Sequence, residues 1–246
     1  MSIPLSAQRG RGAGTTEPPP SPQASAPIDL TGYWVSVVTE DWRYRMVTPA
    51  KGDYQGVPMT PEAVKVADAW DPAADEAAGN QCKSYGAAAI MRVPGRIRVS
   101  WQDDTTLRLE TDAGTQTRLF RFSPSQAEPG AATWQGESTA QWELPRAGRG
   151  RAGGQPAEPP KSGSLKVVTS RLRAGYLRKN GVPYSDRATL TEYFNLVRHR
   201  NGDQWLVVTT VVEDAQFLRQ PFMVSSHFRK QADGAGWDPT PCSSTW

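Results

Sequence analysis

The clearest pattern of apolar and polar positions lies between residues 187 and 229, where β-branched and aromatic residues are concentrated. The run from Arg187 to Val197 alternates along the chain in the way that is typical of a strand with one buried face. Asn201-Gly202 follows it and favours a tight turn into the apolar run Trp205–Val212. Pro221 can begin a third strand, because that position needs no backbone donor. The segment therefore predicts a meander of three antiparallel strands.

Shorter strands precede this meander. The first is predicted to run from Tyr33 to Met46, and later hairpins flank Pro94-Gly95 and residues 112–114. Thr60-Pro61-Glu62 has the order of a helix start: an N-cap, a proline at the first helical position and an acid in the first turn. The predicted fold class is all-β. We expect an antiparallel meander of nine or ten strands that closes into a single barrel, with one short helical insertion after the first strand.

Two segments contain many glycine and proline residues and few apolar side chains. Residues 1–27 are predicted to form a disordered leader and residues 145–163 a mobile loop, because neither can bury enough apolar surface to fold. The stretch Ile3–Gln8 resembles the end of a signal peptide, although no apolar core precedes it. Residues 28–246 are predicted to form one barrel domain.

Composition excludes several classes of function. The net charge is only +3, and no cluster of lysines and arginines resembles the footprint of a nucleic-acid-binding protein. No run of about 18 apolar residues occurs, so no membrane-spanning segment is expected. The chain lacks a glycine-rich phosphate loop, a dinucleotide fingerprint and a histidine cluster, so neither a cofactor nor a metal is predicted. The sequence does not predict an oligomeric state.

Cys82 and Cys242 are the only cysteines, and they lie far apart in the sequence. As a metal or redox pair they would make a poor set, because the chain has only two histidines to complete it. The other interpretation is a disulfide that ties the C-terminal tail to the first third of the chain. Such a bond implies an oxidising compartment and predicts a periplasmic or secreted protein.

Three short motifs resemble a known superfamily. Gly32-Tyr33-Trp34 resembles the Gly-x-Trp motif that opens the first strand of the lipocalins and wider calycins. In that family an arginine of the last strand packs across the tryptophan, so the resemblance implies that Trp34 and Arg229 close the barrel. Thr191-Glu192-Tyr193 is similar to the family's Thr-Asp-Tyr motif, although here it lies within a strand. The resemblance implies a barrel that holds a small ligand.

Glu192 and His227 are the candidate catalytic residues. Strand alternation places Glu192 on an apolar face with Leu190 and Phe194, where its carboxylate is desolvated and must be paired or hold a proton. It is therefore either an acid/base group or ligand anchor, or one half of an ion pair with an inward arginine. His227 is a proton-transfer candidate, since histidine titrates near neutral pH, or else a packed side chain without a role in chemistry.

Aromatic and cationic residues supply the candidate ligand-binding positions. Trp42, Arg43 and Tyr44 alternate as they would on a cavity wall, or on an edge strand with solvated arginines. Tyr176 and Tyr184 frame a turn that carries Arg178-Lys179, and such a loop could clamp an anionic or aromatic ligand or simply plug the barrel end. Tyr193 would line the interior if its strand were rotated by one position.

Three functions are consistent with these residues. The first is an exported β-barrel that binds a small apolar or aromatic molecule in its interior. The second is a cofactor-free isomerase, lyase or cyclase that uses Glu192 or His227 in the same cavity. The third is a structural or accessory protein with a packed barrel. The partner in the first two is a small molecule.

Overall fold

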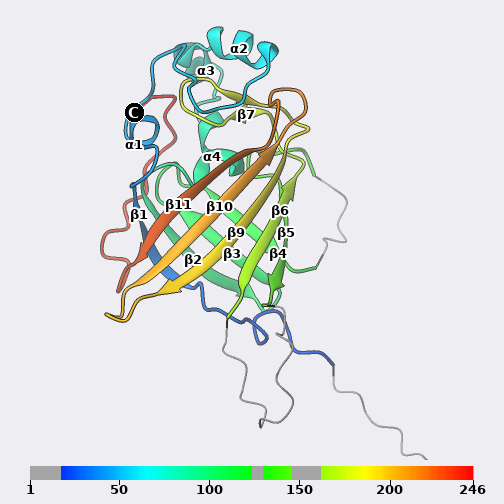
Figure 1. The fold of residues 1–246 in the computed structure, drawn as a ribbon, viewed down its shortest axis with the longest axis vertical. Helices are drawn as coiled ribbons and strands as arrows, with labels where there is room; N and C mark the ends of the chain where they lie inside the picture. The colour runs from blue at the N-terminus through cyan, green and yellow to red at the C-terminus, as the bar shows by residue number, and fades with distance from the viewer. Residues whose placement is uncertain (1–17, 124–129, 146–161, 246) are drawn as a thin grey trace, which may run out of the picture.

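The computed structural model describes residues 18–123, 130–145 and 162–245. Within these ranges nine strands form a closed barrel, which confirms the predicted β-barrel (Figure 1). In chain order the strands are β1 (Gly32–Val37), β2 (Arg96–Asp103), β3 (Thr106–Thr111), β4 (Thr117–Arg121), β5 (Glu137–Glu143), β6 (Ser164–Ser170), β9 (Thr189–Arg198), β10 (Gln204–Glu213) and β11 (Phe222–Lys230). A separate hairpin consists of β7 (Gly175–Tyr176) and β8 (Pro183–Tyr184).

The strand order differs from a simple antiparallel meander in one place. β4 and β5 are parallel, with Phe120 opposite Ser138 and Arg121 opposite Thr139. A parallel pair needs a connection that returns the chain to the end of the sheet where the first strand began. β5 begins at Glu137, after the described residues 130–136. The sheet is therefore mixed.

β1 closes the barrel, because it pairs with β2 on one edge and with β11 on the other. Trp34 is fully buried, and its Nε1 donates to the backbone oxygen of Leu30 at 2.9 Å. The cation that covers its ring is Lys230, with Nζ 4.4 Å from a ring centroid. Arg229 is exposed, so the expected Trp34–Arg229 contact is wrong by one residue, because successive side chains of β11 point to opposite faces.

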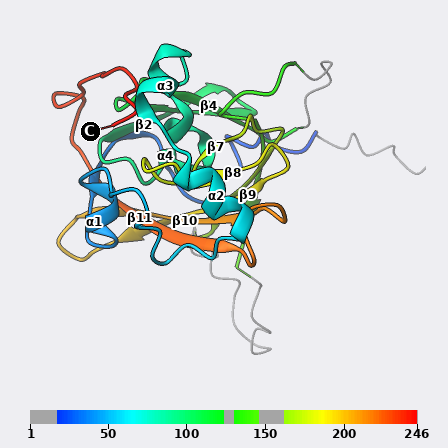
Figure 2. The ribbon, with the colours of Figure 1, turned by 90° about the horizontal axis from the view of Figure 1, so that it is seen from above.

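The segment between β1 and β2 contains the helices and covers one end of the barrel, called here the helical end (Figures 1 and 2). β1 and β2 are antiparallel neighbours, so this segment leaves and re-enters the sheet at the same end. No helix in the described ranges is both long and apolar enough to cross a membrane. The helices are α1 (Trp42–Arg45), α2 (Pro61–Asp68), α3 (Pro72–Ala77), the 3-10 turn η1 (Lys83–Tyr85) and α4 (Ala87–Ile90).

Local sequence explains two of these helices, and tertiary packing the other two. Thr60 caps α2 by accepting from the Ala63 backbone N–H at 3.2 Å, and Asp71 caps α3 in the same way. Residues 42–45 and 87–90 were expected in strands but are helical. Asp41 turns the chain with a φ of 50° before α1, and all four residues of α4 are buried, where small alanines allow close packing.

The barrel interior is filled by two buried apolar clusters with a polar layer between them. On β9, for example, Leu190 belongs to the cluster at the helical end and Phe194 to the other, with Glu192 between them. The buried residues of this layer are Arg118, Ser138, Thr169, Glu192, Thr210 and Ser226. Among the described residues, the side chains that face the interior are thus mostly buried and apolar.

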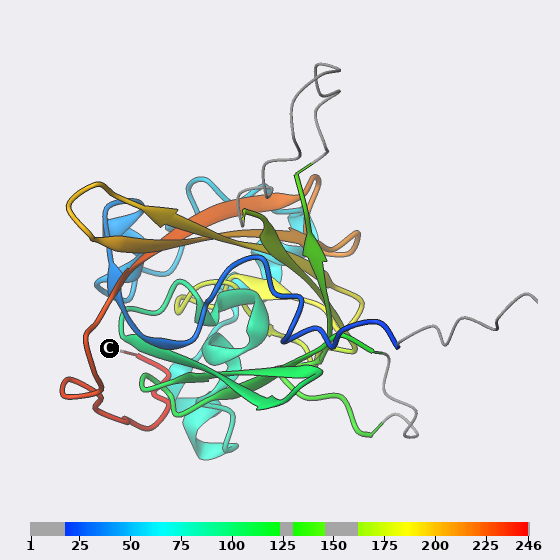
Figure 3. The same cartoon turned by 90° about the horizontal axis from the view of Figure 1, so that it is seen from below.

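The opposite end of the barrel is crossed by residues that precede β1 (Figure 3). Trp142 Nε1 donates to the Pro22 oxygen at 2.9 Å, and the Gln23 N–H donates to the Asp104 oxygen at 3.1 Å. These contacts belong to residues 18–27 of the predicted leader. The rest of that leader, and residues 146–161 of the predicted loop, lie outside the described ranges.

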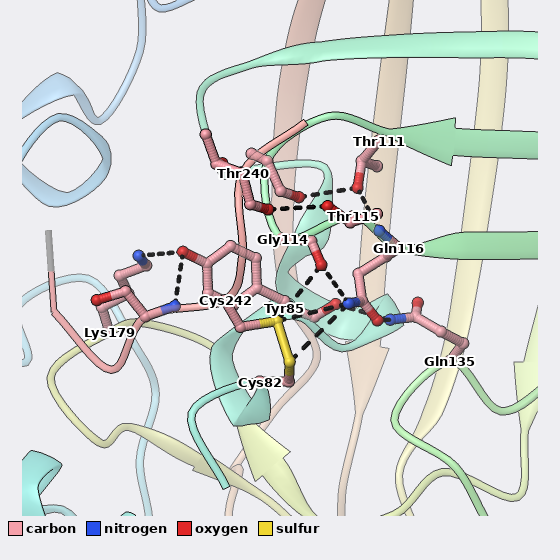
Figure 4. Close-up of a disulfide and its surroundings, with 12 residues drawn as sticks. Cys82, Tyr85, Thr111, Gly114, Thr115, Gln116, Gln135, Lys179, Thr240 and Cys242 are labelled. Carbon is pink, nitrogen blue, oxygen red and sulfur yellow. Dashed lines mark hydrogen bonds between the residues drawn. A yellow bond between two sulfur atoms is a disulfide. The ribbon is translucent and has the colours of Figure 1, made fainter. Parts of the chain in front are cut away.

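Cys82 and Cys242 form the predicted disulfide, which is confirmed (Figure 4). The bond holds the C-terminal tail against the turn that joins β3 to β4. There Thr115 Oγ1 donates to the Thr240 oxygen at 2.9 Å, and the Thr240 N–H donates to the Asp112 oxygen at 2.9 Å. The tail is therefore part of the folded domain.

Reduction of this bond is expected to lower the free energy of unfolding by about 2–5 kcal/mol, because the bond restricts a long loop of the unfolded chain. Denaturant unfolding with and without a reductant measures the difference. Thiol titration of the unreduced, denatured protein should find no reactive cysteine, and finding two would contradict the bond.

Candidate functional site

Glu192 lies in the polar layer of the barrel core and has no exposed surface. Arg118 donates to it through both terminal nitrogens, Nη1 to Oε1 at 2.9 Å and Nη2 to Oε2 at 2.5 Å. Arg118 Nη2 also donates to Thr169 Oγ1, which lies 2.8 Å from Ser138 Oγ. This is the ion pair with an inward arginine, one of the two interpretations of Glu192. The bidentate contact fixes the position of the Glu192 carboxylate inside the barrel.

His227 lies on the outer face of β11, so it does not share a cavity with Glu192. Its ring is partly exposed, and Nδ1 lies 3.1 Å from Thr39 Oγ1 and 3.1 Å from Glu40 Oε2. Both partners follow the end of β1, next to α1. The structure therefore places the two candidate catalytic residues on opposite sides of the sheet.

The aromatic candidates are dispersed. Trp42 is 66% exposed on α1. Arg43 pairs with Asp53 at 2.5 Å at the surface. Tyr193 lies on the outer face of β9, and its ring centroid is 5.8 Å from the Lys166 ammonium. These three residues do not converge on a common site.

Tyr176 and Tyr184 belong to the β7–β8 hairpin at the helical end. The Tyr176 hydroxyl donates to Asp75 Oδ2 at 2.8 Å, and burial together with this carboxylate raises its pKa. Tyr184 is fully buried, and burial raises its pKa as well. Both tyrosines fasten the hairpin to the domain, and neither lines the pocket that the same loop helps to form.

That pocket lies at the helical end and is the candidate functional site, called here the basic pocket. It is small, with a volume of about 20 Å³. Cationic side chains from three separate segments meet there. Its lining residues are Tyr44, Arg45, Ser84, Ala89, Arg92, Val93, Leu177, Arg178 and Lys179.

Three of these cations are arginines that are almost completely buried: Arg45, Arg92 and Arg178. Arg45 pairs with Glu40 through Nη1, and its Nε donates to the Arg92 backbone oxygen at 2.8 Å. Arg92 Nη1 pairs with Asp41 Oδ2 at 3.0 Å. The two carboxylates thus each compensate one guanidinium.

Arg178 has no carboxylate within ion-pair distance among the described residues. Its Nη1 donates to the Gln55 backbone oxygen at 2.8 Å, and its guanidinium lies 4.1 Å from the centroid of the Tyr44 ring. Burial, followed by repulsion from Arg92, lowers its pKa to about 10. Within the described ranges, Arg178 Nε and Arg92 Nη2 are buried without an acceptor. The carboxylates of Asp41 and Asp53 act on Arg178 from a greater distance and oppose part of the shift. The pocket therefore holds three buried guanidiniums, of which two have a carboxylate in direct contact.

Lys179 adds a further cation to the lining. Its Nζ donates to the Tyr85 hydroxyl at 2.7 Å, and burial lowers its pKa to about 8. Tyr85 also accepts from the Ser243 N–H in the tail that the disulfide holds, at 3.4 Å (Figure 4). The tail and the basic pocket are thus connected through one tyrosine.

The backbone positions this lining with two unusual turns. Asp41 adopts the left-handed conformation, which aspartate tolerates better than most residues and which directs its carboxylate to Arg92. Gly181 has a φ of +81°, and a Cβ there would lie 2.3 Å from Trp70. The loop that carries Arg178 and Lys179 is therefore held tightly against the helical segment. Asn180 strengthens this contact by donating to the backbone oxygens of Ala50 and Asp53.

A wider pocket of about 480 Å³ lies at the opposite end of the barrel, between residues 23–31 and the side chains of Trp101 and Arg198. Its charged groups, Asp29 and Arg198, are exposed. Solvent therefore screens both charges, and this pocket lacks the buried charge imbalance of the basic pocket.

The sequence indicated only part of the basic pocket. Arg178 and Lys179 stood out beside the turn formers of their loop, and Tyr44 and Arg45 stood in an aromatic and cationic run. Arg92 was overlooked, although it is the one charged residue in the apolar run from Gly86 to Val93. An isolated arginine in such a run is a signal of a buried, functional or paired cation.

Comparisons with protein-family models, curated proteins and solved structures return no match. The fold and the site together define the class of the protein: a closed, mixed β-barrel with a cationic pocket at its helical end. The resemblance to lipocalins and calycins stays a prediction from the sequence.

Glu192→Gln is expected to lower the free energy of unfolding by about 3–5 kcal/mol, because it leaves the Arg118 charge buried and uncompensated. The control is Glu137→Gln, which removes an exposed carboxylate from its pair with Arg171 and should cost less than about 1 kcal/mol. Denaturant unfolding of both variants measures the two costs. Equal, small effects would show that the interior pair does not support the barrel.

Proposed function

We propose that this chain is a binding protein that holds the anionic group of a small molecule in the basic pocket. The observation that carries the proposal is the charge balance of three buried guanidiniums. Arg45, Arg92 and Arg178 lie together, whereas Glu40 and Asp41 are the carboxylates that pair with them among the described residues. An anion would supply the missing charge and acceptors for Arg92 Nη2 and Arg178 Nε.

The size of the pocket limits what it can hold. A volume of about 20 Å³ is little more than the space that one water molecule needs, so the pocket can receive an oxygen of an anionic group but not a whole ligand. The Tyr44 ring lines the same pocket and is only half-buried, so an aromatic or apolar portion of the ligand can lie against it. The ligand class expected from the sequence, apolar or aromatic, is thus extended to an acid of that kind, bound at the end of the barrel.

The two alternatives receive different support. Acid/base catalysis by Glu192 is not favoured, because Arg118 holds both oxygens of its carboxylate. Catalysis by His227 inside the barrel is not favoured either, because its ring lies on the outer face of β11. A purely structural role is favoured by the filled interior, and it predicts that no anion binds in the basic pocket. Export to an oxidising compartment remains part of the proposal and is supported by the Cys82–Cys242 bond.

Calorimetric titration with sulfate and with benzoate tests the binding function. Arg178→Gln should weaken binding of either anion roughly tenfold or more, because a charge-assisted hydrogen bond contributes about 1.5–3 kcal/mol. The matched control is Arg219→Gln, which removes an exposed arginine at the same end of the barrel and should leave affinity unchanged. Melting curves recorded without anion verify that both variants fold. Anion binding that is equally weakened by both variants, or absent from the wild type, would contradict the proposal.

Affinity for sulfate should fall as the pH rises through about 8, since the pKa of Lys179 is lowered to about 8 and the side chain is a cation only below that value. Sulfate itself does not change charge in this range. Lys179→Met should remove the dependence and give weak binding on both sides of it. A wild-type affinity that is constant across this range would show that Lys179 does not contribute to the site.

A further inference from the structure

Glu40 is shared between the basic pocket and the outer surface of the barrel. Its Oε1 accepts from Arg45 Nη1, and Arg45 is a buried member of the pocket. Its Oε2 accepts from Thr39 Oγ1 at 2.7 Å and lies 3.1 Å from His227 Nδ1. One carboxylate therefore contacts a pocket cation and a surface histidine at the same time, where α1 lies beside β11 (Figure 2).

Few other charges face His227. Its neighbours across the sheet are Val37 on β1 and Val207 on β10, which are both apolar. On β11 itself, the flanking positions of the outer face are Ser225 and the cation Arg229. Among these positions Arg229 is the one charged residue, and Glu40 is the charged residue in contact with His227.

The protonation state of His227 determines how much of the positive charge of Arg45 is neutralised by the Glu40 carboxylate. A neutral ring leaves the carboxylate to Arg45 and the Thr39 hydroxyl. A protonated ring donates to Oε2, so that the same carboxylate serves two cations. The net charge around Glu40 and Arg45 then rises by one, and with it the attraction of the basic pocket for an anion.

We infer that the basic pocket is regulated by pH through the chain His227–Glu40–Arg45, so that protonation of His227 tightens anion binding. The inference rests on the proposed function, since it concerns the same site. By linkage, anion binding is accompanied by proton uptake at His227. The sign follows from the charge: the affinity for an anion is higher when the His227 ring is protonated and lower when it is neutral.

The size of the effect follows from Coulomb's law. One added charge at a separation on the order of 10 Å changes the affinity for a singly charged anion roughly twofold at the dielectric constant of water, and roughly tenfold or more at an effective value near 20. The effect on sulfate is larger, because sulfate carries two charges. The effect should shrink as ionic strength rises, because the histidine is partly exposed.

The test is sulfate titration of the full chain at about pH 5.5 and about pH 7, on the two sides of the histidine range and about one unit below the pKa of Lys179. The wild type should bind sulfate more tightly at the lower pH, by roughly twofold or more. His227→Gln should bind equally at both. The chain offers a matched control, since its only other histidine is His199, which is exposed beside the β9–β10 turn. His199→Gln should keep the wild-type dependence.

Glu40→Gln gives a readout that damage to the fold would not produce. It removes the charge that compensates Arg45, so sulfate should bind more tightly than to the wild type and with no difference between the two pH values. A weaker affinity, or a pH dependence that survives in His227→Gln or Glu40→Gln, would overturn the inference while leaving the anion site in place. Absence of sulfate binding at both pH values would overturn the proposed function and this inference with it.

Discussion

Closure of the sheet through β1 is the constraint on which the rest of the structure depends. Because β1 pairs with both β2 and β11, the barrel has no open edge, and its interior becomes a core filled from both ends. The same pairing brings the end of β1 and the start of β2 together. All helices of the intervening segment therefore lie at one end, where they cover the barrel and bring Arg45 and Arg92 to the loop that carries Arg178.

The protein buries two groups of charged side chains, and the two groups differ in how far opposite charges offset the cost of desolvation. In the core, Arg118 and Glu192 neutralise each other with bidentate geometry and neighbouring hydroxyls. At the helical end, three buried arginines lie close together, and two carboxylates contact them among the described residues. Burial lowers the pKa of Arg178 and of Lys179 there. A buried charge without a partner is costly, and groups with perturbed pKa values are concentrated at functional sites, so the second group is the better candidate for a binding site.

Local patterns predicted much of the barrel. Alternation placed Glu192 inside, Asn201-Gly202 marked the β9–β10 turn, and Thr60 marked a helix start. Longer-range features were not predictable in this way. The parallel β4–β5 pair depends on the path of a connection, and α1 and α4 form where packing overrides strand-like composition. The basic pocket was only partly foreseen, because its arginines come from segments whose contact is created by barrel closure.

If the basic pocket binds anions, an anion must be found next to its buried arginines. Crystals grown or soaked in selenate allow the anion to be located by its anomalous scattering. We predict a peak in the basic pocket, within hydrogen-bond distance of Arg92 Nη2 and Arg178 Nε. A pocket that contains only water or protein atoms under these conditions, with the three arginines in place, would contradict the account.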